Sequence, residues 1–255
     1  MAEEEKEVID KELYDVSTFL NEQTCFIQRK DGFRFGTDTF LLADFVKLKG
    51  SEKIIDLGTG CGVIPILLLK KYSRIKACAI DVLEENIEIS EKNAEINGVS
   101  ERFSALHLNV KEVKRVFKSG EFDVVITNPP FIEVGKGNIA EKNHRAIARQ
   151  EITANLEDFI EAASYLLKNK GRFYILLPVQ RFVDAISLMR EKKLEPKRLR
   201  FIHPEPGKDA NLFLLEGRKN SGKGIVVESP LVVYKNAKKR IYTEEVERKY
   251  SSFLD

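Results

Sequence analysis

Two short runs of residues in this chain could do chemistry, and each follows the pattern of a buried β-strand. The first is Asp56-Leu-Gly58-Thr-Gly60-Cys-Gly62, an acid followed by alternating glycines. Glycines let the backbone pass close to a ligand at the carboxyl edge of a sheet, where α/β folds bind ligands. Position 63, where a dinucleotide-binding fingerprint needs a further glycine, holds a valine. We therefore expect Asp56 and the three glycines to bind a ligand, and an acid before them suits a cation better than a pyrophosphate.

Two polar residues follow the next two strand patterns. Asp81 ends the second strand, at a distance from Gly58 that fits one strand–turn–helix–strand unit, and is placed to accept hydrogen bonds from a ribose diol. Asn109 follows the third strand and could reach an adenine amine through its amide. A turn residue before the next helix explains Asn109 equally well. A tight turn without a ligand is the alternative for the glycines, and Asp56 and Asp81 together argue against it.

The second run is Asn128-Pro129-Pro130-Phe131, at the end of the fourth strand pattern. Two prolines remove two backbone donors and fix the chain direction, which is more than strand termination needs. The Asn128 side-chain oxygen and the Pro129 carbonyl could accept both protons of a planar amine, leaving its lone pair aimed at a methyl sulfonium. Rigidly placed acceptors are then the catalytic device, and Phe131 would stack on the planar group. We predict that these four residues are catalytic; a plain turn is the alternative.

Strand and helix patterns alternate through the middle of the chain and position both runs. Such alternation predicts an α/β fold with a parallel, doubly wound sheet. The tail contains three apolar pieces that indicate two or three antiparallel strands. We therefore predict a Rossmann-like, seven-stranded, mostly parallel sheet with an antiparallel C-terminal strand pair. The expected strands are 53–57, 75–81, 103–108, 122–128, 172–178 and pieces near 199–203, 211–217 and 230–234. The expected helices are 63–72, 82–98, 154–168 and 179–193, and the third is expected to end near Gly171.

The chain is expected to form one domain, residues 21–255, after an acidic extension, residues 1–20, that is helical or frayed at its start. The stretch 132–150 has no periodicity and is expected to be a mobile loop. No apolar run approaches the length of a membrane span, and no signal peptide is evident. The cysteines suit neither a disulfide framework nor a zinc site, and the histidines have no ligand spacing, so we expect no metal and a cytoplasmic protein.

Charge is distributed unevenly along the chain. The formal net charge is +2, but residues 1–15 carry seven acids and two lysines. Between Lys192 and Arg240 there are thirteen Lys or Arg residues and five acids. An anionic partner could use this basic segment. A solvated lysine-rich face is the alternative, and charge alone favours it.

At these residues the chain resembles the class I methyltransferases dependent on S-adenosylmethionine (SAM) that carry an Asn-Pro-Pro-aromatic motif. Within that class it most resembles the bacterial family that methylates N6 of adenosine 37, beside the anticodon, in a valine tRNA. The resemblance spans about residues 28–250. Besides the two runs above, it rests on Gly32-Phe33-Arg34-Phe35-Gly36-Thr37-Asp38 with Leu41 and Leu42, on Ala148-Arg149-Gln150-Glu151, on His203-Pro204 and on Pro230-Leu231-Val232-Val233-Tyr234.

The resemblance implies a class I methyltransferase fold, SAM as cofactor, S-adenosylhomocysteine as product and a tRNA substrate. It also implies that segment 33–42 closes over the cofactor and helps to form the base pocket. A half-buried strand around Phe35 and a cap by Asp38 on a helix beginning near Thr39 are the structural alternatives. The predicted cofactor-binding residues are Phe35, Thr37, Asp38, Asp56, Gly58, Gly60, Gly62, Asp81, Asn109 and Asn128, and the predicted substrate-binding residues are Arg149, Lys238, Lys239 and Arg240.

The predicted activity is N6 methylation of an adenine in RNA, at adenosine 37 of the anticodon loop, by a monomer or weak dimer. The family's usual aromatic is tyrosine, so Phe131 keeps stacking but loses a phenol hydrogen bond. A glutamine N5-methyltransferase acting on release factors is the main alternative, because a glutamine amide is also planar; that family carries a helical domain before the core. A fold that only binds cofactor or RNA and a DNA adenine methyltransferase are further alternatives.

Overall fold

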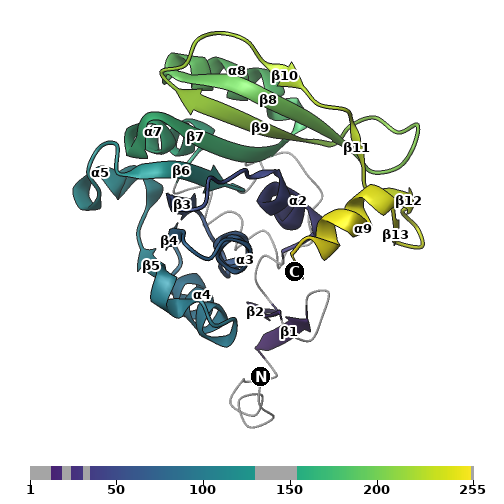
Figure 1. Ribbon diagram of the computed structural model, residues 1–255, viewed down its shortest axis with the longest axis horizontal. Coiled ribbons are helices and arrows are strands. Elements are labelled where there is room, and N and C mark those ends of the chain that lie inside the picture. Colours follow the sequence, from purple (N-terminus) through teal and green to yellow (C-terminus); the bar gives the residue numbers. More distant parts are fainter. Residues whose placement is uncertain (1–12, 19–23, 31–34, 130–153, 254–255) are drawn as a thin grey trace.

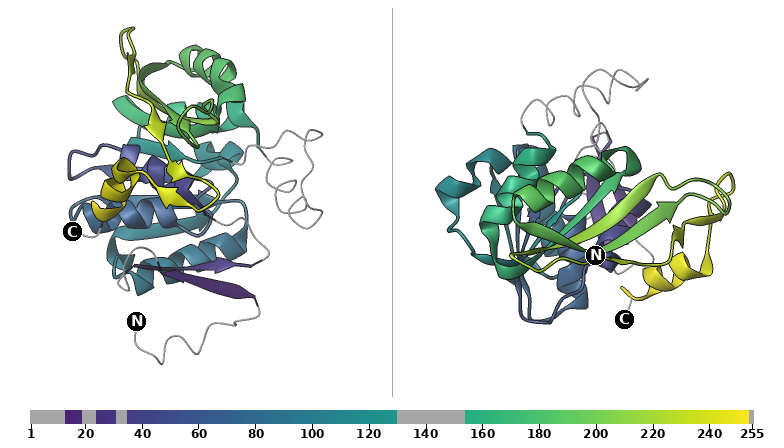
Figure 2. Two further views of the ribbon diagram at one scale, coloured as in Figure 1. Left: turned by 90° about the vertical axis from the view of Figure 1, so that its right-hand side faces the viewer. Right: turned by 90° about the horizontal axis from the view of Figure 1, so that it is seen from above.

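The computed structural model describes residues 13–18, 24–30, 35–129 and 154–253. Its centre is a nine-stranded sheet with helices packed against both faces (Figures 1 and 2). Two small antiparallel hairpins lie outside this sheet. One pairs β1 (Tyr14–Thr18) with β2 (Cys25–Arg29), and the other pairs β12 (Tyr234–Asn236) with β13 (Ile241–Tyr242).

Seven strands make up most of the sheet, in the spatial order β8-β9-β7-β6-β3-β4-β5. Among them β9 alone runs against its neighbours, β7 and β8, and the other pairings are parallel. The two-residue strands β10 and β11 both pair with β8 in parallel. The seven are β3 (Lys53–Leu57), β4 (Lys76–Asp81), β5 (Phe103–His107), β6 (Phe122–Thr127), β7 (Leu167–Pro178), β8 (Leu194–His203) and β9 (Leu212–Lys219), and the short strands are β10 (Val226–Val227) and β11 (Leu231–Val232). The predicted seven-stranded, mostly parallel sheet with an antiparallel C-terminal pair is confirmed.

Side chains alternate between the two faces of the sheet and build one apolar core on each. Ile54 and Val124 belong to one core, whereas their neighbours Ile55 and Val125 belong to the other. Helices cover the first core with α2 (Thr37–Phe45), α3 (Val63–Lys71), α4 (Glu84–Ile96) and α9 (Glu244–Ser251), and the second with α5 (Val113–Val116), α7 (Leu156–Leu166) and α8 (Phe182–Glu191). Short 3-10 helices span Ser100–Arg102, Val110–Glu112 and Val179–Arg181.

The start of the acidic extension, expected to be helical or frayed, lies outside the described residues. Later in the expected extension, the sequence Tyr-Asp-Val-Ser-Thr favours a strand and forms β1, which pairs with β2. Two other local expectations were wrong. Strand β7 begins at Leu167, so Gly171 lies inside the strand, where a Cβ would stand 2.9 Å from the Lys168 carbonyl, instead of ending a helix. The piece near residue 231 runs parallel to β8, not antiparallel.

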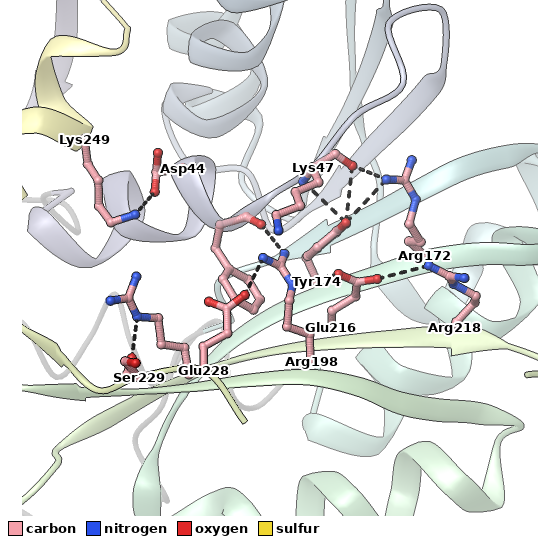
Figure 3. Close-up of polar contacts among 12 residues, drawn as sticks. Asp44, Lys47, Arg172, Tyr174, Arg198, Glu216, Arg218, Glu228, Ser229 and Lys249 are labelled. Atoms are coloured by element: carbon pink, nitrogen blue, oxygen red, sulfur yellow. Dashed lines mark hydrogen bonds and ion pairs between the residues drawn. The ribbon is translucent and has the colours of Figure 1, made fainter. Parts of the chain in front are cut away.

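A buried set of charged residues fixes α2 to the sheet. Arg198 of β8 donates to the Phe45 carbonyl at 2.5 Å, stands 3.8 Å from the centre of the Phe45 ring and pairs with Glu216 at 3.0 Å (Figure 3). Arg172 of β7 pairs with Glu52, in the loop that follows α2. We call these four charged residues, Arg172, Arg198, Glu52 and Glu216, the arginine network. It holds the C-terminal end of α2, and therefore also the first turn of that helix, in a defined place.

Candidate active site

The predicted site residues meet at the carboxyl edge of three adjacent strands. The glycine turn follows β3, Asp81 ends β4 and Asn128 follows β6. Since β3 lies between β4 and β6 and all three run parallel, their carboxyl ends share one edge of the sheet. A ligand at this edge could contact all three segments, which is where open α/β sheets bind ligands.

The glycine turn uses backbone conformations that side chains rarely adopt. Gly58, Gly60 and Gly62 have φ angles of +73°, +56° and +82°. A Cβ on Gly62 would also stand 2.9 Å from the Cβ of Ser90 in α4. By contrast, a Cβ on Gly60 would meet no described atom within 4 Å. The shape of the turn therefore requires the glycines, and no described residue fills the space beside Gly60.

Asp81 holds the glycine turn in this shape. Its carboxylate accepts the Gly60 N–H at 2.9 Å and the Leu83 N–H at 3.0 Å, and the residue is only 2% exposed. Burial raises the pKa of Asp81, whereas these backbone hydrogen bonds lower it. The Asn86 side chain and the Val82 N–H also donate to this carboxylate, and the ribose contact stays a prediction. The structure adds a role in organising the turn.

Asp56 is buried and only half satisfied. One carboxylate oxygen accepts the Thr59 hydroxyl at 2.8 Å, while the other has no hydrogen-bond partner. Desolvation raises the pKa of Asp56 to about 7; the Thr59 hydrogen bond opposes the shift, and nearby Asp81 adds to it. A buried carboxylate with an open acceptor favours a cation beside it. This is the chemistry that the sequence predicted for a ligand of this turn.

Asn128 also presents an open acceptor. Its side-chain oxygen is buried and has no hydrogen-bond partner among the described residues, while its amide nitrogen lies 3.4 Å from the Thr39 hydroxyl of α2. Pro129 is buried beside it. A group with N–H donors could therefore satisfy the Asn128 oxygen, as the proposed chemistry needs. The other two predicted catalytic residues, Pro130 and Phe131, lie outside the described residues, as does the stretch 132–150.

The first turn of α2 brings the predicted segment 33–42 to this edge, as far as it is described. The Thr37 hydroxyl lies 3.0 Å from the Tyr242 hydroxyl of β13, and the Phe35 ring contacts Phe26 edge-on with centroids 5.6 Å apart. Helix α2 begins at Thr37 with Gly36 before it, so Asp38 lies in the first turn and does not cap the helix. The structural alternative, a cap by Asp38, is therefore wrong, and its predicted role in cofactor binding stays a prediction.

A family model described as the methyltransferase small domain matches residues 18–195 of this chain. The chain belongs to this methyltransferase family. Two relatives bear the name tRNA1(Val) (adenine(37)-N6)-methyltransferase. The one from Flavobacteriaceae bacterium strain 3519-10 is 28% identical and covers 86% of this chain and 90% of its own length. The one from Trichodesmium erythraeum is 29% identical and covers 70% and 77%.

Two solved structures with the same fold are described as methyltransferases. One, described as a predicted O-methyltransferase from Agrobacterium tumefaciens, is 21% identical with a TM-score of 0.69, over 85% of this chain and 96% of its own. Another, a geranyl diphosphate C-methyltransferase from Streptomyces coelicolor, holds S-adenosylhomocysteine; it is 10% identical with a TM-score of 0.52, over 71% and 79%. These likenesses establish the fold, and the predicted resemblance to a methyltransferase family is confirmed.

The remaining predicted residues of the methyltransferase are less tightly clustered. The Asn109 side chain accepts the Lys111 N–H at 3.0 Å and caps a 3-10 helix, so its contact with an adenine stays a prediction. Lys238, Lys239 and Arg240 are exposed in the turn between β12 and β13. Arg149 lies outside the described residues.

The described part of the methyltransferase contains neither a membrane-spanning helix nor a metal-binding cluster. No helix there is long and apolar enough to cross a membrane. No group of three or more His, Cys, Asp or Glu side chains there could hold a metal ion.

Sequence reasoning missed Thr39, which approaches the Asn128 amide from a different element. It is buried in α2, 89 positions away from Asn128 along the chain. A threonine at a helix start is ordinary, so its type gave no signal. Only its place in the segment predicted to form the base pocket could have drawn attention to it.

Proposed function

We propose that this chain is a SAM-dependent methyltransferase that methylates N6 of an adenine in tRNA, at adenosine 37 of the anticodon loop. The observation that carries the proposal is the buried, unpartnered oxygen of Asn128 at the carboxyl edge of the sheet. An exocyclic amine brings the N–H donor that this oxygen lacks. The names of the relatives supply the nucleotide and the class of RNA.

The described residues at β3 and β4 fit a cationic methyl donor. When bound, SAM supplies an electrophilic methyl group on a positively charged sulfur. The open oxygen of Asp56 offers the negative charge that a cationic ligand needs, and the open space at Gly60 offers room for it. Asp81 shapes the turn by accepting the Gly60 and Leu83 N–H groups, and a ribose hydroxyl would be a further donor to this carboxylate.

Asn128 addresses the difficulty of the reaction, which is that the lone pair of an adenine amine is delocalised into the ring. The Asn128 oxygen and the Pro129 carbonyl would each accept one N–H of the amine and favour a pyramidal nitrogen. The nitrogen lone pair then forms the new N–C bond while the methyl–sulfur bond breaks, and the methylated nitrogen afterwards releases one proton to water. The acceptors are placed before the reaction begins, so little reorganisation is required.

An anticodon-loop adenine suits such a site better than a paired base. A base inside a helical stack cannot reach a group at a sheet edge, so it must be extruded, and loop nucleotides cost least to extrude. Free adenosine lacks the rest of the RNA and is expected to be a poor substrate.

The proposal is tested with purified enzyme, tRNA and SAM carrying an isotopically labelled methyl group. We expect label in N6-methyladenosine, found by mass spectrometry of the digested nucleosides, and nuclease mapping should place it at position 37. The same assay with a release factor tests the glutamine alternative. Label in a release-factor glutamine, with none in tRNA, would replace this function by that alternative.

A further inference from the structure

The basic segment from Lys192 to Arg240 contains two kinds of cation. Some of its arginines have structural roles. Arg198 belongs to the arginine network (Figure 3). Arg200 pairs with Glu245 at 2.6 Å and donates to the Ser229 carbonyl at 2.9 Å. The second kind is exposed and without ion pairs to described residues, and it includes the run Lys238-Lys239-Arg240, which we call the basic turn. None of the three forms an ion pair with a described residue. Charge that serves no internal contact is available to a partner.

The basic turn lies at the same edge of the sheet as the candidate active site. Strand β8 runs in the direction of β6, because β9 is antiparallel to both β8 and β7 while β7 and β6 are parallel. The carboxyl end of β8, at His203, therefore shares the edge of Asn128. The carbonyls of His203 and Pro204 accept the N–H groups of Val233 and Tyr234, which join the β12–β13 hairpin to this end (Figure 1).

Side chains connect the hairpin to the acceptor group. The Tyr242 hydroxyl of β13 lies 3.0 Å from the Thr37 hydroxyl, and Thr39, two residues further along α2, contacts Asn128. The Tyr242 ring also stacks on Tyr234 with centroids 5.0 Å apart. The hairpin thus borders the candidate active site. Its turn places three positively charged side chains, without ion pairs to described residues, farther from that site.

We propose that the basic turn binds phosphates of the RNA substrate. The RNA segment that leads to the target base would then pass over the part of the carboxyl edge that β8 forms. This inference rests on the proposed function. An RNA backbone carries one negative charge per nucleotide, and three adjacent cations match two or three consecutive phosphates. The position of the basic turn gives the two ligands separate places along the sheet edge. The cofactor would lie at β3 and β4, and the RNA would lie beyond β6 toward β8.

A matched pair of triple variants tests the inference. The first changes Lys238, Lys239 and Arg240 to glutamine. The second changes Lys76, Lys193 and Lys223 to glutamine; these are also exposed and without described ion pairs, but lie at the opposite edge of the sheet, at the start of β4, before β8 and after β9. Both remove three positive charges. Any effect of net charge alone is therefore common to the two proteins.

The measurements are tRNA affinity at several salt concentrations, S-adenosylhomocysteine affinity and methyl transfer to tRNA. The basic-turn variant should bind tRNA roughly 10- to 100-fold more weakly, with a salt slope smaller by roughly 2. Its S-adenosylhomocysteine affinity should stay unchanged, and saturating tRNA should recover its rate. The opposite-edge variant should change tRNA affinity by less than about 3-fold.

Equal losses in the two variants, or none in the basic-turn variant, would overturn the docking surface. Failure of the proposed function looks different, because the unaltered protein would then place no methyl group in tRNA. If the unaltered protein methylates tRNA and the basic-turn variant binds it normally, the function stands and the surface is wrong.

Discussion

Two sets of buried polar groups in this molecule are arranged in opposite ways. In the arginine network, Arg198 has Glu216, Glu228, a carbonyl and an aromatic ring as partners. At the candidate active site, Asp56 and Asn128 each keep one buried oxygen without a partner. An unpaired buried polar group costs about 1–3 kcal/mol. The network uses buried polarity to fix α2, and the site keeps unused acceptors that a ligand can satisfy.

The comparison separates stability from function in a way that single substitutions can test. Removing a member of the network should leave a buried charge behind and destabilise the fold. Removing an open acceptor should leave the fold intact and affect binding or turnover, since it has no partner within the described protein. The predictions below run from the largest expected effect to the smallest.

Asn128→Ala should reduce the rate at saturating tRNA and SAM by roughly 10²–10³-fold, as expected for loss of a preorganised group that acts in the transition state. S-adenosylhomocysteine affinity should stay within a few-fold, and the unfolding free energy within about 1 kcal/mol. Asn128→Asp keeps an acceptor oxygen and should retain more activity. Steady-state kinetics, calorimetry and denaturant unfolding check these values, and an alanine variant with near-normal turnover would contradict the mechanism.

Arg198→Met should lower the unfolding free energy by about 3–5 kcal/mol, because it leaves the buried Glu216 without its main partner. Arg218→Met is the matched control. Arg218 contacts the same Glu216 at 3.6 Å, but its side chain is 42% exposed, so its loss should cost about 1 kcal/mol or less. Urea unfolding measures both. Similar losses in the two variants would show that burial does not set the strength of this network.

Asp56 should make stability and cofactor affinity respond to pH in opposite directions. Its pKa is about 7 in the folded chain, against an ordinary value of 3.8. The folded chain therefore binds the Asp56 proton more tightly than the unfolded chain, and protonation stabilises the fold. This stabilisation is complete below pH 4 and is lost as pH rises through about 7. Between pH 5 and 8 the unliganded protein should lose on the order of 2 kcal/mol relative to Asp56→Asn.

Affinity for the cationic cofactor should instead rise over the same pH range, as the carboxylate forms. Calorimetric titrations at pH 6 and 8 measure this change in SAM affinity. Asp56→Asn should remove both trends. Parallel pH profiles for the two proteins would mean that Asp56 does not face the cofactor.

Thr39→Val should give the smallest effect, a roughly 3- to 10-fold decrease in kcat, equivalent to one hydrogen bond. The Thr39 hydroxyl lies 3.4 Å from the Asn128 amide nitrogen and keeps the amide oxygen directed to the open position. KM for tRNA should hardly change, and Thr39→Ser should restore kcat because it keeps the hydroxyl. A loss in both variants, or a loss confined to KM, would assign Thr39 to packing.

The order of the elements could be predicted from sequence because strand and helix periods are local. The run 53–57 is short, mostly apolar and bounded by turn residues, and β3 has these bounds in the structure. Gly171 shows the limit of the method. A glycine after an apolar helix pattern resembles a helix end, yet this glycine relieves crowding inside β7, which depends on contacts with Lys168 and Asp123.

The residues of the candidate active site also divide into those that could be predicted from sequence and those that could not. Asp56, Asp81 and Asn128 each follow a strand, so their shared sheet edge follows from a parallel topology. The contact of Thr39 with Asn128 could not be predicted, because it depends on how α2 packs across the sheet. The split of the basic segment into structural and free cations has the same origin. Arg198 and Lys238 are alike in charge, and only the fold separates them.

A single asparagine gives the N-terminal hairpin a connection to the glycine turn. The Asn93 side chain accepts the Ile27 N–H at 2.7 Å and donates to the carbonyls of Ile27 and Cys61 at 2.9 and 2.8 Å. Asn93 thus forms hydrogen bonds with the β2 backbone, as a neighbouring strand would, and one with the glycine turn that follows β3. A ligand that tightens this turn should therefore slow hydrogen exchange at the Ile27 amide. Hydrogen exchange at Ile27, in the β1–β2 hairpin outside the central sheet, would then indicate whether a ligand occupies the glycine turn.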